Sequence, residues 1–238
     1  MLFFLFAFFT EVAGTMAGFG SSTLVLPLAL LFFDFKSALV IVALLHIFGN
    51  VGRVAFFRHG LDKRLIILFG IPSVICAVIG ASLVNYISQD VLRFILGIFL
   101  LLFAGVSLIK PALQFPPTKT SALVGGGASG FIAGLIGTGG ALRGSFLTAF
   151  NLDKNVYIAT SAIIAIAVDI TRLPIYLAGG FLDAQYYWYI PILFAVAIVG
   201  SFIGKLIMNI ISQHTFRVVV LSAIGIIGMK FILDWISI

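Results

Sequence analysis

The chain contains the stretch Ile87-Ser88-Gln89-Asp90-Val91-Leu92-Arg93, which returns in altered form as Ile211-Ser212-Gln213-His214-Thr215-Phe216-Arg217. Other pairs recur in the same order: Gly14-Thr15-Met16-Ala17-Gly18 with Gly130-Phe131-Ile132-Ala133-Gly134, and Asn50-Val51-Gly52-Arg53-Val54 with Asp169-Ile170-Thr171-Arg172-Leu173. The match therefore spans both halves of the chain. Many transporters are built from two such halves and bind substrate where the halves meet, so transport is the first function that the sequence suggests.

The composition requires a lipid environment. Of the 238 residues, 62% are hydrophobic and 9% are charged, and the mean hydropathy is +1.25, whereas soluble domains carry about 25% charged residues. We therefore expect an all-α, polytopic membrane protein. The net charge of +6 does not indicate nucleic acid, because the basic residues lie singly between apolar segments, as in cytoplasmic loops. A single cysteine, Cys76, excludes an intrachain disulfide.

Eight apolar segments can be drawn, and they divide into two halves. An N-terminal membrane repeat covers residues 1–110 and a C-terminal repeat covers 120–238, with a proline-rich linker at 111–119 that cannot continue a helix. The expected segments are about 2–33, 36–57, 64–86, 91–110, 121–150, 155–178, 185–210 and 215–235. Segments one and five are longer than a span needs. Each is either one long tilted helix or two half-helices around an unwound, Gly-rich centre.

The charge bias favours halves of opposite orientation. The region after segment two carries Arg53, Arg58, His59, Lys63 and Arg64, whereas the matching region after segment six has Asp183 and no lysine or arginine. Because cytoplasmic loops are the basic ones, equivalent loops lie on opposite faces. This requires an odd number of crossings per half. We therefore expect two inverted repeats, each a broken or re-entrant helical segment followed by three transmembrane helices.

The two breaks are the candidate substrate site. Irregular backbone at membrane depth is tolerated where protein or a cavity surrounds it, and half-helix N-termini attract anions. The residues expected to bind substrate here are Gly20, Ser21, Ser22, Thr23, Gly137, Thr138, Gly139 and Gly140. The alternative is close helix packing, which we favour for Gly14, Gly18, Gly130 and Gly134 because of their small-xxx-small spacing.

Three arginines and an asparagine could join that site. Arg143 follows the second break directly, and Asn50 shares a helix face with Arg53. A guanidinium fork matches the geometry of an oxyanion, so these residues favour a small anionic substrate. For Arg53 and Arg172 an equal alternative is that they extend to the membrane interface, and Arg172 could pair with Asp169.

Three other ionisable residues lie within apolar segments, namely Glu11, His46 and Asp169. Each could take up and release a proton during transport. The structural alternatives are a pore-mouth Glu11, a hydrogen-bonded His46 and a salt-bridged Asp169, and we favour the structural alternative for the last two.

The whole pattern resembles the sulfite exporter TauE/SafE family of membrane permeases. The resemblance depends on two halves that each open with a Gly-rich broken segment, residues 14–27 and 130–144, followed by a helix with small residues such as Ala159-Thr160-Ser161-Ala162. It implies a secondary transporter of the bacterial inner membrane that moves sulfite or organosulfonates, in the direction of export. The chain has no G-x-x-x-x-G-K-[ST] sequence for ATP and no H-E-x-x-H or G-x-S-x-G motif, so no cofactor and no enzymatic activity are expected.

Alternatives to this function remain open at this stage. They are a carrier or channel for another small anion and an intramembrane enzyme. The expected partners are a small anion and the lipid bilayer, and pairing into a homodimer is a further alternative.

Overall fold

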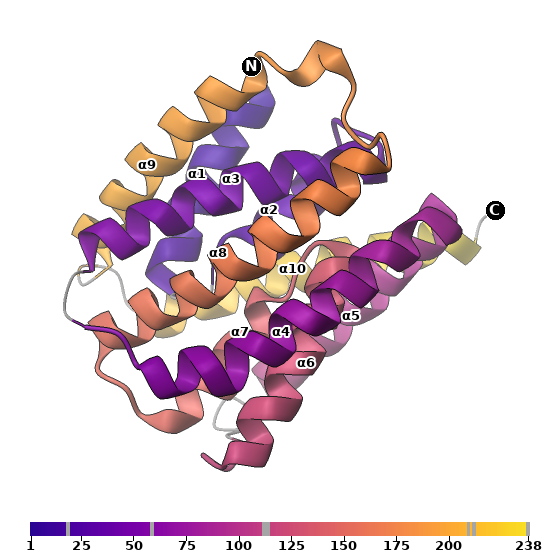
Figure 1. Ribbon diagram of the computed structural model, residues 1–238. Helices are drawn as coiled ribbons and strands as arrows, with labels where there is room; N and C mark the ends of the chain where they lie inside the picture. Colours follow the sequence, from indigo (N-terminus) through magenta and orange to yellow (C-terminus); the bar gives the residue numbers. More distant parts are fainter. Residues whose placement is uncertain (18–19, 58–59, 111–114, 209, 211–212, 237–238) are drawn as a thin grey trace.

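The computed structural model describes residues 1–238 except 18–19, 58–59, 111–114, 209, 211–212 and 237–238, and it does not describe the side chains of 213–217. The described chain forms α-helices and short 3-10 turns, and these residues contain no strand (Figure 1). The all-helical prediction is therefore confirmed.

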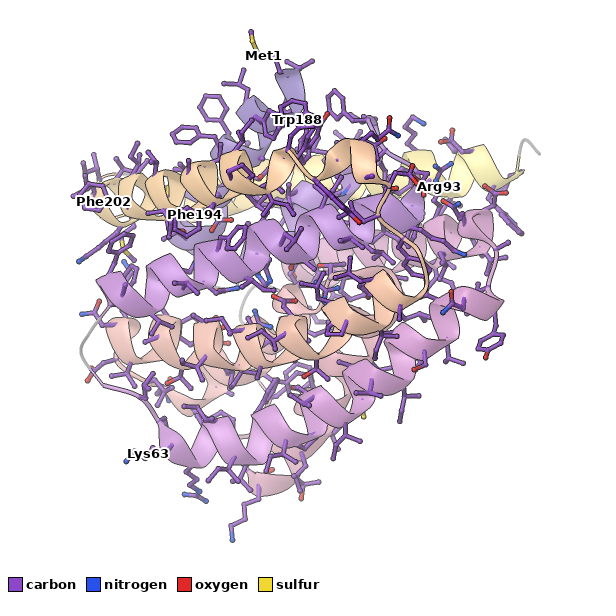
Figure 2. All side chains as sticks on the ribbon, turned by 45° about the horizontal axis from the view of Figure 1, so that its top comes forward. Met1, Lys63, Arg93, Trp188, Phe194 and Phe202 are labelled. Atoms are coloured by element: carbon purple, nitrogen blue, oxygen red, sulfur yellow. The ribbon has the colours of Figure 1, made fainter. Side chains whose placement is uncertain are left out.

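In the part of the chain that the structure describes, six helices are long and apolar enough to cross a membrane, which confirms a multi-pass membrane protein. They are α3 (Phe35–Phe56), α4 (Lys63–Leu83), α5 (Gln89–Ile109), α8 (Lys154–Ala178), α9 (Tyr189–Ile207) and α10 (Gln213–Ile236). Side-chain caps start some of them: Asp34 accepts hydrogen bonds from two backbone amides of the first turn of α3, and Ser88 accepts one at the start of α5. Outward-facing Phe194 and Phe202 on α9 are about half exposed (Figure 2).

Both long apolar segments are broken. The first divides into α1 (Leu2–Ala17) and α2 (Ser22–Ala29), and the second into α6 (Lys119–Ile136) and α7 (Gly140–Leu147). Gly137 ends α6 in the left-handed conformation at φ 77°, which glycine adopts without a steric penalty. The alternative of single long helices is therefore wrong, and the described residues form ten α-helices where the sequence predicted eight apolar segments. At 1.5 Å per residue, α2 and α7 extend only about 12 Å, too short to cross a bilayer.

Helices from the two halves pack against each other in a reciprocal pattern. α4 lies along α6, and α9 lies along α1; α3 pairs with α8, and α5 pairs with α10 (Figure 1). Each of these pairs joins one helix from residues 1–110 to one from residues 120–238. The core is therefore formed between the halves rather than within either of them.

Glycines allow the closest of these contacts, between α4 and α6. A methyl group at Gly130 would collide with the carbonyl of Ser73, so only a hydrogen fits. The same holds one turn to either side, where Gly126 and Gly134 meet the carbonyls of Phe69 and Ala77. The prediction that Gly130 and Gly134 serve packing is confirmed, and Gly14 likewise packs against the backbone of Ser21. Gly18 lies outside the described residues.

Basic residues collect at one end of the bundle, which we call the basic end and define by Lys63, Arg64, Lys119 and Lys205. Arg64 and Lys119 line one hollow together with Asp62. The Lys205 ammonium donates to the carbonyl oxygen of Phe56 at 2.8 Å, where α3 ends. Figure 2 shows Lys63 at the end of the molecule opposite Arg93.

The prediction that Arg53 belongs to the basic loop region is wrong. Arg53 lies inside α3, where only 2% of it is exposed. Positions 58 and 59 are outside the described residues. The basic character after α3 therefore depends on Lys63 and Arg64, which are exposed at the start of α4.

Candidate functional site

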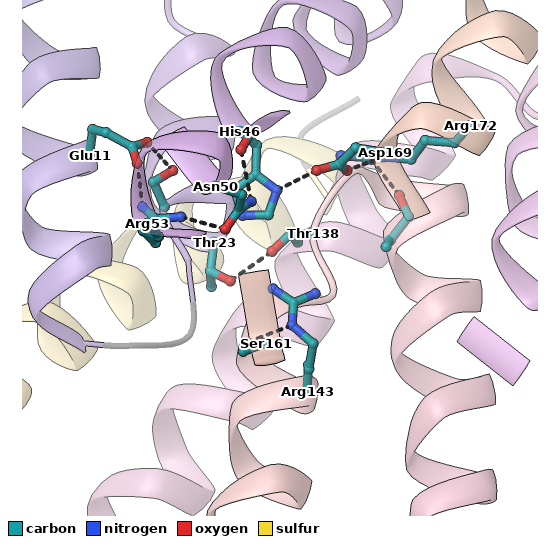
Figure 3. Close-up of polar contacts among 12 residues, drawn as sticks. Glu11, Thr23, His46, Asn50, Arg53, Thr138, Arg143, Ser161, Asp169 and Arg172 are labelled. Atoms are coloured by element: carbon teal, nitrogen blue, oxygen red, sulfur yellow. Dashed lines mark hydrogen bonds and ion pairs between the residues drawn. The ribbon is translucent and has the colours of Figure 1, made fainter. Parts of the chain in front are cut away.

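The two helix breaks meet inside the protein. The hydroxyl groups of Thr23 and Thr138 lie 2.8 Å apart and form a hydrogen bond, and both residues are fully buried. Thr23 lies in the first turn of α2, and Thr138 lies between α6 and α7. Two positions more than a hundred residues apart are thus joined beside the unwound backbone (Figure 3).

Glu11 and Arg53 form an ion pair at the first break. Glu11 is fully buried on α1, and its carboxylate pairs with the Arg53 guanidinium. It also accepts hydrogen bonds from the Ser21 hydroxyl at 2.5 Å and from the Ser201 hydroxyl at 3.1 Å. The carboxylate therefore connects α1, the start of α2, α3 and α9.

Arg53 extends this network along α3. Its Nε donates to the Thr15 hydroxyl at 3.0 Å, and its Nη1 donates to the Asn50 side-chain oxygen at 2.8 Å. The Asn50 amide in turn donates to the carbonyl of His46 at 2.7 Å. A guanidinium held by these partners does not extend to the membrane interface, so that alternative is wrong for Arg53.

Asp169 and Arg172 form the corresponding pair at the second break. Both lie on α8, one turn apart, with the Arg172 Nε 2.9 Å from the Asp169 Oδ1. The Arg172 Nη1 donates to the Ala133 carbonyl at 2.6 Å, and the Tyr176 hydroxyl donates to the Gly134 carbonyl at 2.5 Å. These carbonyls lie near the end of α6, where the Gly137 amide already donates to the Ala133 carbonyl at 3.0 Å. Arg172 is 1% exposed, so it does not extend to the interface either.

His46 connects the second pair to the first break. Its Nδ1 lies 2.7 Å from the Asp169 Oδ2. Its Nε2 is buried and has no hydrogen-bond partner among the residues that the structure describes. This nitrogen faces Gly20, where an added methyl group would lie 2.5 Å from it. Gly20 has a φ of 96°, so the conformation and the space both require glycine there.

Arg143 approaches the same point from the other half. It lies on α7, is 3% exposed, and its Nε donates to the Ser161 hydroxyl of α8 at 2.9 Å. Its Nη2 would lie 3.5 Å from a methyl group at Gly20. The imidazole of His46 and the guanidinium of Arg143 thus converge on Gly20; Figure 3 shows both side chains near Thr23 and Thr138.

The other residues expected at the breaks have contacts that hold the backbone. Gly139 packs closely over the Ser129 carbonyl, and Gly137 caps α6. Ser21 already donates to Glu11, and Ser22 and Gly140 are the buried first residues of α2 and α7. The structure therefore places all of the expected residues at or beside the breaks, and it brings Gly20, His46 and Arg143 together at one point.

Sequence reasoning gave no role to four hydroxyl-bearing residues that complete these contacts: Thr15, Ser161, Tyr176 and Ser201. A single hydroxyl in an apolar helix is common and carries little signal. The sequence signal for Tyr176 is its position four residues after Arg172, which places both residues on one helix face.

Buried arginines outnumber buried carboxylates around the two breaks. Three buried arginines, Arg53, Arg143 and Arg172, stand against two buried carboxylates, Glu11 and Asp169. Charges inside a membrane protein are costly and usually serve structure or function. An excess of positive charge beside unwound backbone suits the binding of a small anion.

Comparison with known families identifies one match. The model of the sulfite exporter TauE/SafE family matches residues 3–231, nearly the whole chain. No curated protein and no solved structure matches the chain. The chain belongs to the sulfite exporter TauE/SafE family, which is a family of membrane transporters.

Proposed function

We propose that this member of the TauE/SafE family is a secondary transporter that carries small sulfur-containing anions, such as sulfite or organosulfonates, out across the bacterial inner membrane. One observation carries the proposal: the Arg143 guanidinium and the unpartnered Nε2 of His46 converge on Gly20 between two helix breaks. The family match supports the substrate class.

The substrate would bind between His46 and Arg143 near Gly20, and because not even a methyl group fits at Gly20 in this conformation, the helix break would have to open to admit it. Arg143 would provide the charge for the anion, and the Thr23 and Thr138 hydroxyls lie within the same region. Arg53 and Arg172 already face carboxylates, so we assign them to holding the broken helices rather than to direct contact. Asn50 would act with Arg53.

Inverted repeats and alternating access belong to the same proposal. The reciprocal packing supports the repeats, since α4 on α6 mirrors α9 on α1, while α3 with α8 and α5 with α10 pair each helix with its own counterpart. A pseudo-twofold axis in the membrane plane produces such a pattern. The positive-inside rule supports a cytoplasmic position for the basic end.

Flux measurements in proteoliposomes test the function. The purified protein would be given a panel of anions (sulfite, sulfoacetate, methanesulfonate and sulfate, with chloride as a control). We expect saturable flux of one or more sulfur anions, accelerated when the same anion is present on the far side. Linear flux without that acceleration would indicate a channel, and flux equal to that of protein-free liposomes for the whole panel would contradict the proposal.

A further inference from the structure

We propose that His46 is the proton carrier of the anion site, so that one proton leaves with each exported anion, and the same coupling run in reverse takes up both. The inference depends on the proposed transport function, and it adds the coupling ion and the residue that carries it. Glu11, His46 and Asp169 are the buried titratable groups at the breaks, and their contacts differ.

Each carboxylate already has an arginine as its partner. Glu11 pairs with Arg53 and accepts two hydroxyl hydrogen bonds. Asp169 pairs with Arg172 and with His46. Both carboxylates therefore serve to hold the helix breaks, and we assign the proton to His46.

The two ring nitrogens of His46 have different surroundings. Nδ1 faces the Asp169 carboxylate at 2.7 Å, so it carries the proton in the neutral ring and donates to Asp169. Nε2 then presents a lone pair toward Gly20, with no partner among the described residues. An anion oxygen at this position would be repelled by the neutral ring and would accept a hydrogen bond from the protonated ring.

The two nitrogens lie close enough to act on one anion. Nε2 of His46 and Nη2 of Arg143 lie 2.5 and 3.5 Å from the position of a methyl group at Gly20, so the two nitrogens are separated by no more than the sum of these distances. The first distance leaves no room for a methyl group, so one small oxyanion would bridge the nitrogens by charge-assisted hydrogen bonds of about 2.8 Å after the helix break opens. Anion and proton would then bind together, because each one improves the site for the other.

The charges around the ring agree with this role. Those that act on it are Asp169 of α8, Arg143 of α7 and Arg53 of its own helix. Glu11 of α1 balances Arg53, α2 has no charged residue, and Lys205 of α9 lies at the basic end. With the site empty, burial of the ring and both arginines oppose the proton, and Asp169 favours it. A bound anion shifts this balance toward protonation. The proton would come from water on one side of the membrane and return to water on the other.

The test compares anion and proton movement in the same proteoliposomes, using each panel anion that the wild-type protein carries and a pH dye inside the vesicles. Under an inward proton gradient and with no membrane potential, we expect wild-type protein to accumulate a singly charged anion about tenfold per pH unit, because one proton then moves with one anion. His46→Gln keeps a donor near the Nε2 position but cannot release a proton. We expect any anion flux that it retains to show no gradient-driven accumulation.

His46→Asn is the matched variant, because its shorter amide can reach Asp169 but not Gly20. We expect its anion flux to fall to the background level. Wild-type flux without proton movement would overturn the inference while leaving the transport function intact, and so would gradient-driven accumulation by His46→Gln. This wild-type measurement decides the matter even if a variant fails to accumulate in the membrane. Absence of all anion flux in the wild type would instead overturn the proposed function, and this inference with it.

Discussion

A carboxylate–arginine pair lies at each of the two helix breaks, but the two pairs are arranged differently. At the end of α1 the carboxylate, Glu11, comes from the broken helix itself, and the arginine reaches it from α3. At the end of α6 both charges come from α8, and Arg172 reaches the backbone carbonyl of Ala133. The first break is thus held through side chains and the second through the backbone.

The comparison distinguishes charged residues that hold the broken helices from a charged residue that could bind an anion. An unwound helix inside a membrane leaves polar groups that must find partners, and one carboxylate–arginine pair lies at each break. The remaining arginine, Arg143, lies on α7, whereas its counterpart helix α2 contains no charged residue. The halves are therefore alike in how they are held together and unlike in what they offer an anion.

The largest expected effect comes from removing one carboxylate of a pair. Glu11→Ala and Asp169→Ala would each leave a buried arginine uncompensated, which costs about 3–5 kcal/mol of unfolding free energy. Each substitution also removes further contacts: Glu11→Ala removes the acceptor of the Ser21 and Ser201 hydroxyls, and Asp169→Ala removes the partner of His46. Denaturant unfolding of the purified protein in detergent measures both.

A double substitution serves as the control for that comparison. Replacing Glu11 by Leu and Arg53 by Met removes both charges together and should recover much of the loss seen with Glu11→Ala. Unchanged stability in Asp169→Ala would contradict the view that both breaks depend on their charge pairs.

Arg143→Ala tests the claim that only the second half supplies binding charge. A hydrogen bond to a charged group contributes about 1.5–3 kcal/mol, so flux at low anion concentration should fall about a hundredfold, with the protein still inserted and folded. Arg64→Ala is the matched control, because that arginine is exposed at the basic end. Full flux in Arg143→Ala would remove this residue from the site.

The packing between α4 and α6 can be tested with two glycines. Gly130→Ala forces a methyl group into the Ser73 backbone and should destabilise the protein by about 1–3 kcal/mol. Gly105→Ala, on α5, meets nothing within 4 Å and should be neutral or slightly stabilising. Equal melting temperatures for the two variants would show that the close approach of α4 and α6 contributes nothing to stability.

The smallest effect is expected at the second break. Tyr176→Phe removes the hydrogen bond to the Gly134 carbonyl and should lower the unfolding free energy by about 0.5–1.5 kcal/mol. Tyr187→Phe, at an exposed tyrosine, should change nothing measurable. If the two substitutions behave alike, the backbone of α6 does not need this partner.

Much of the fold could be predicted because a bilayer imposes simple rules on a sequence. Apolar length gave the crossing helices, and the glycines at 137, 139 and 140 gave the break, since α6 ends at Gly137 through its left-handed conformation. Which helices pack together could not be predicted from the sequence. The glycine pattern of α6 does not identify α4 as its partner, because any helix without bulky side chains on one face would fit.

The candidate site was predictable in its residue types but not in its connections. Intramembrane charges such as Glu11 and Arg172 stand out in any apolar segment, yet the pairing of Glu11 with Arg53 joins helices that the sequence does not place side by side. Arg53 was also counted as a loop residue, since its nearness to the end of an apolar segment resembles a loop boundary. Only the structure distinguishes the Nε2 of His46 from its Nδ1.

The pairing of α1 with α9 also has a consequence for how the protein is made. Glu11 on α1 receives a hydrogen bond from Ser201 on α9, and Gly200 packs against the Glu11 side chain. The ribosome completes α1 long before it reaches Ser201, so during most of synthesis a buried carboxylate has no access to its final neighbour on α9. Glu11 meets its counter-charge, Arg53, once α3 has been made, but the hydrogen bond from Ser201 must wait for α9. A substitution at Ser201 should then reduce the yield of inserted protein more than its effect on the finished structure would suggest.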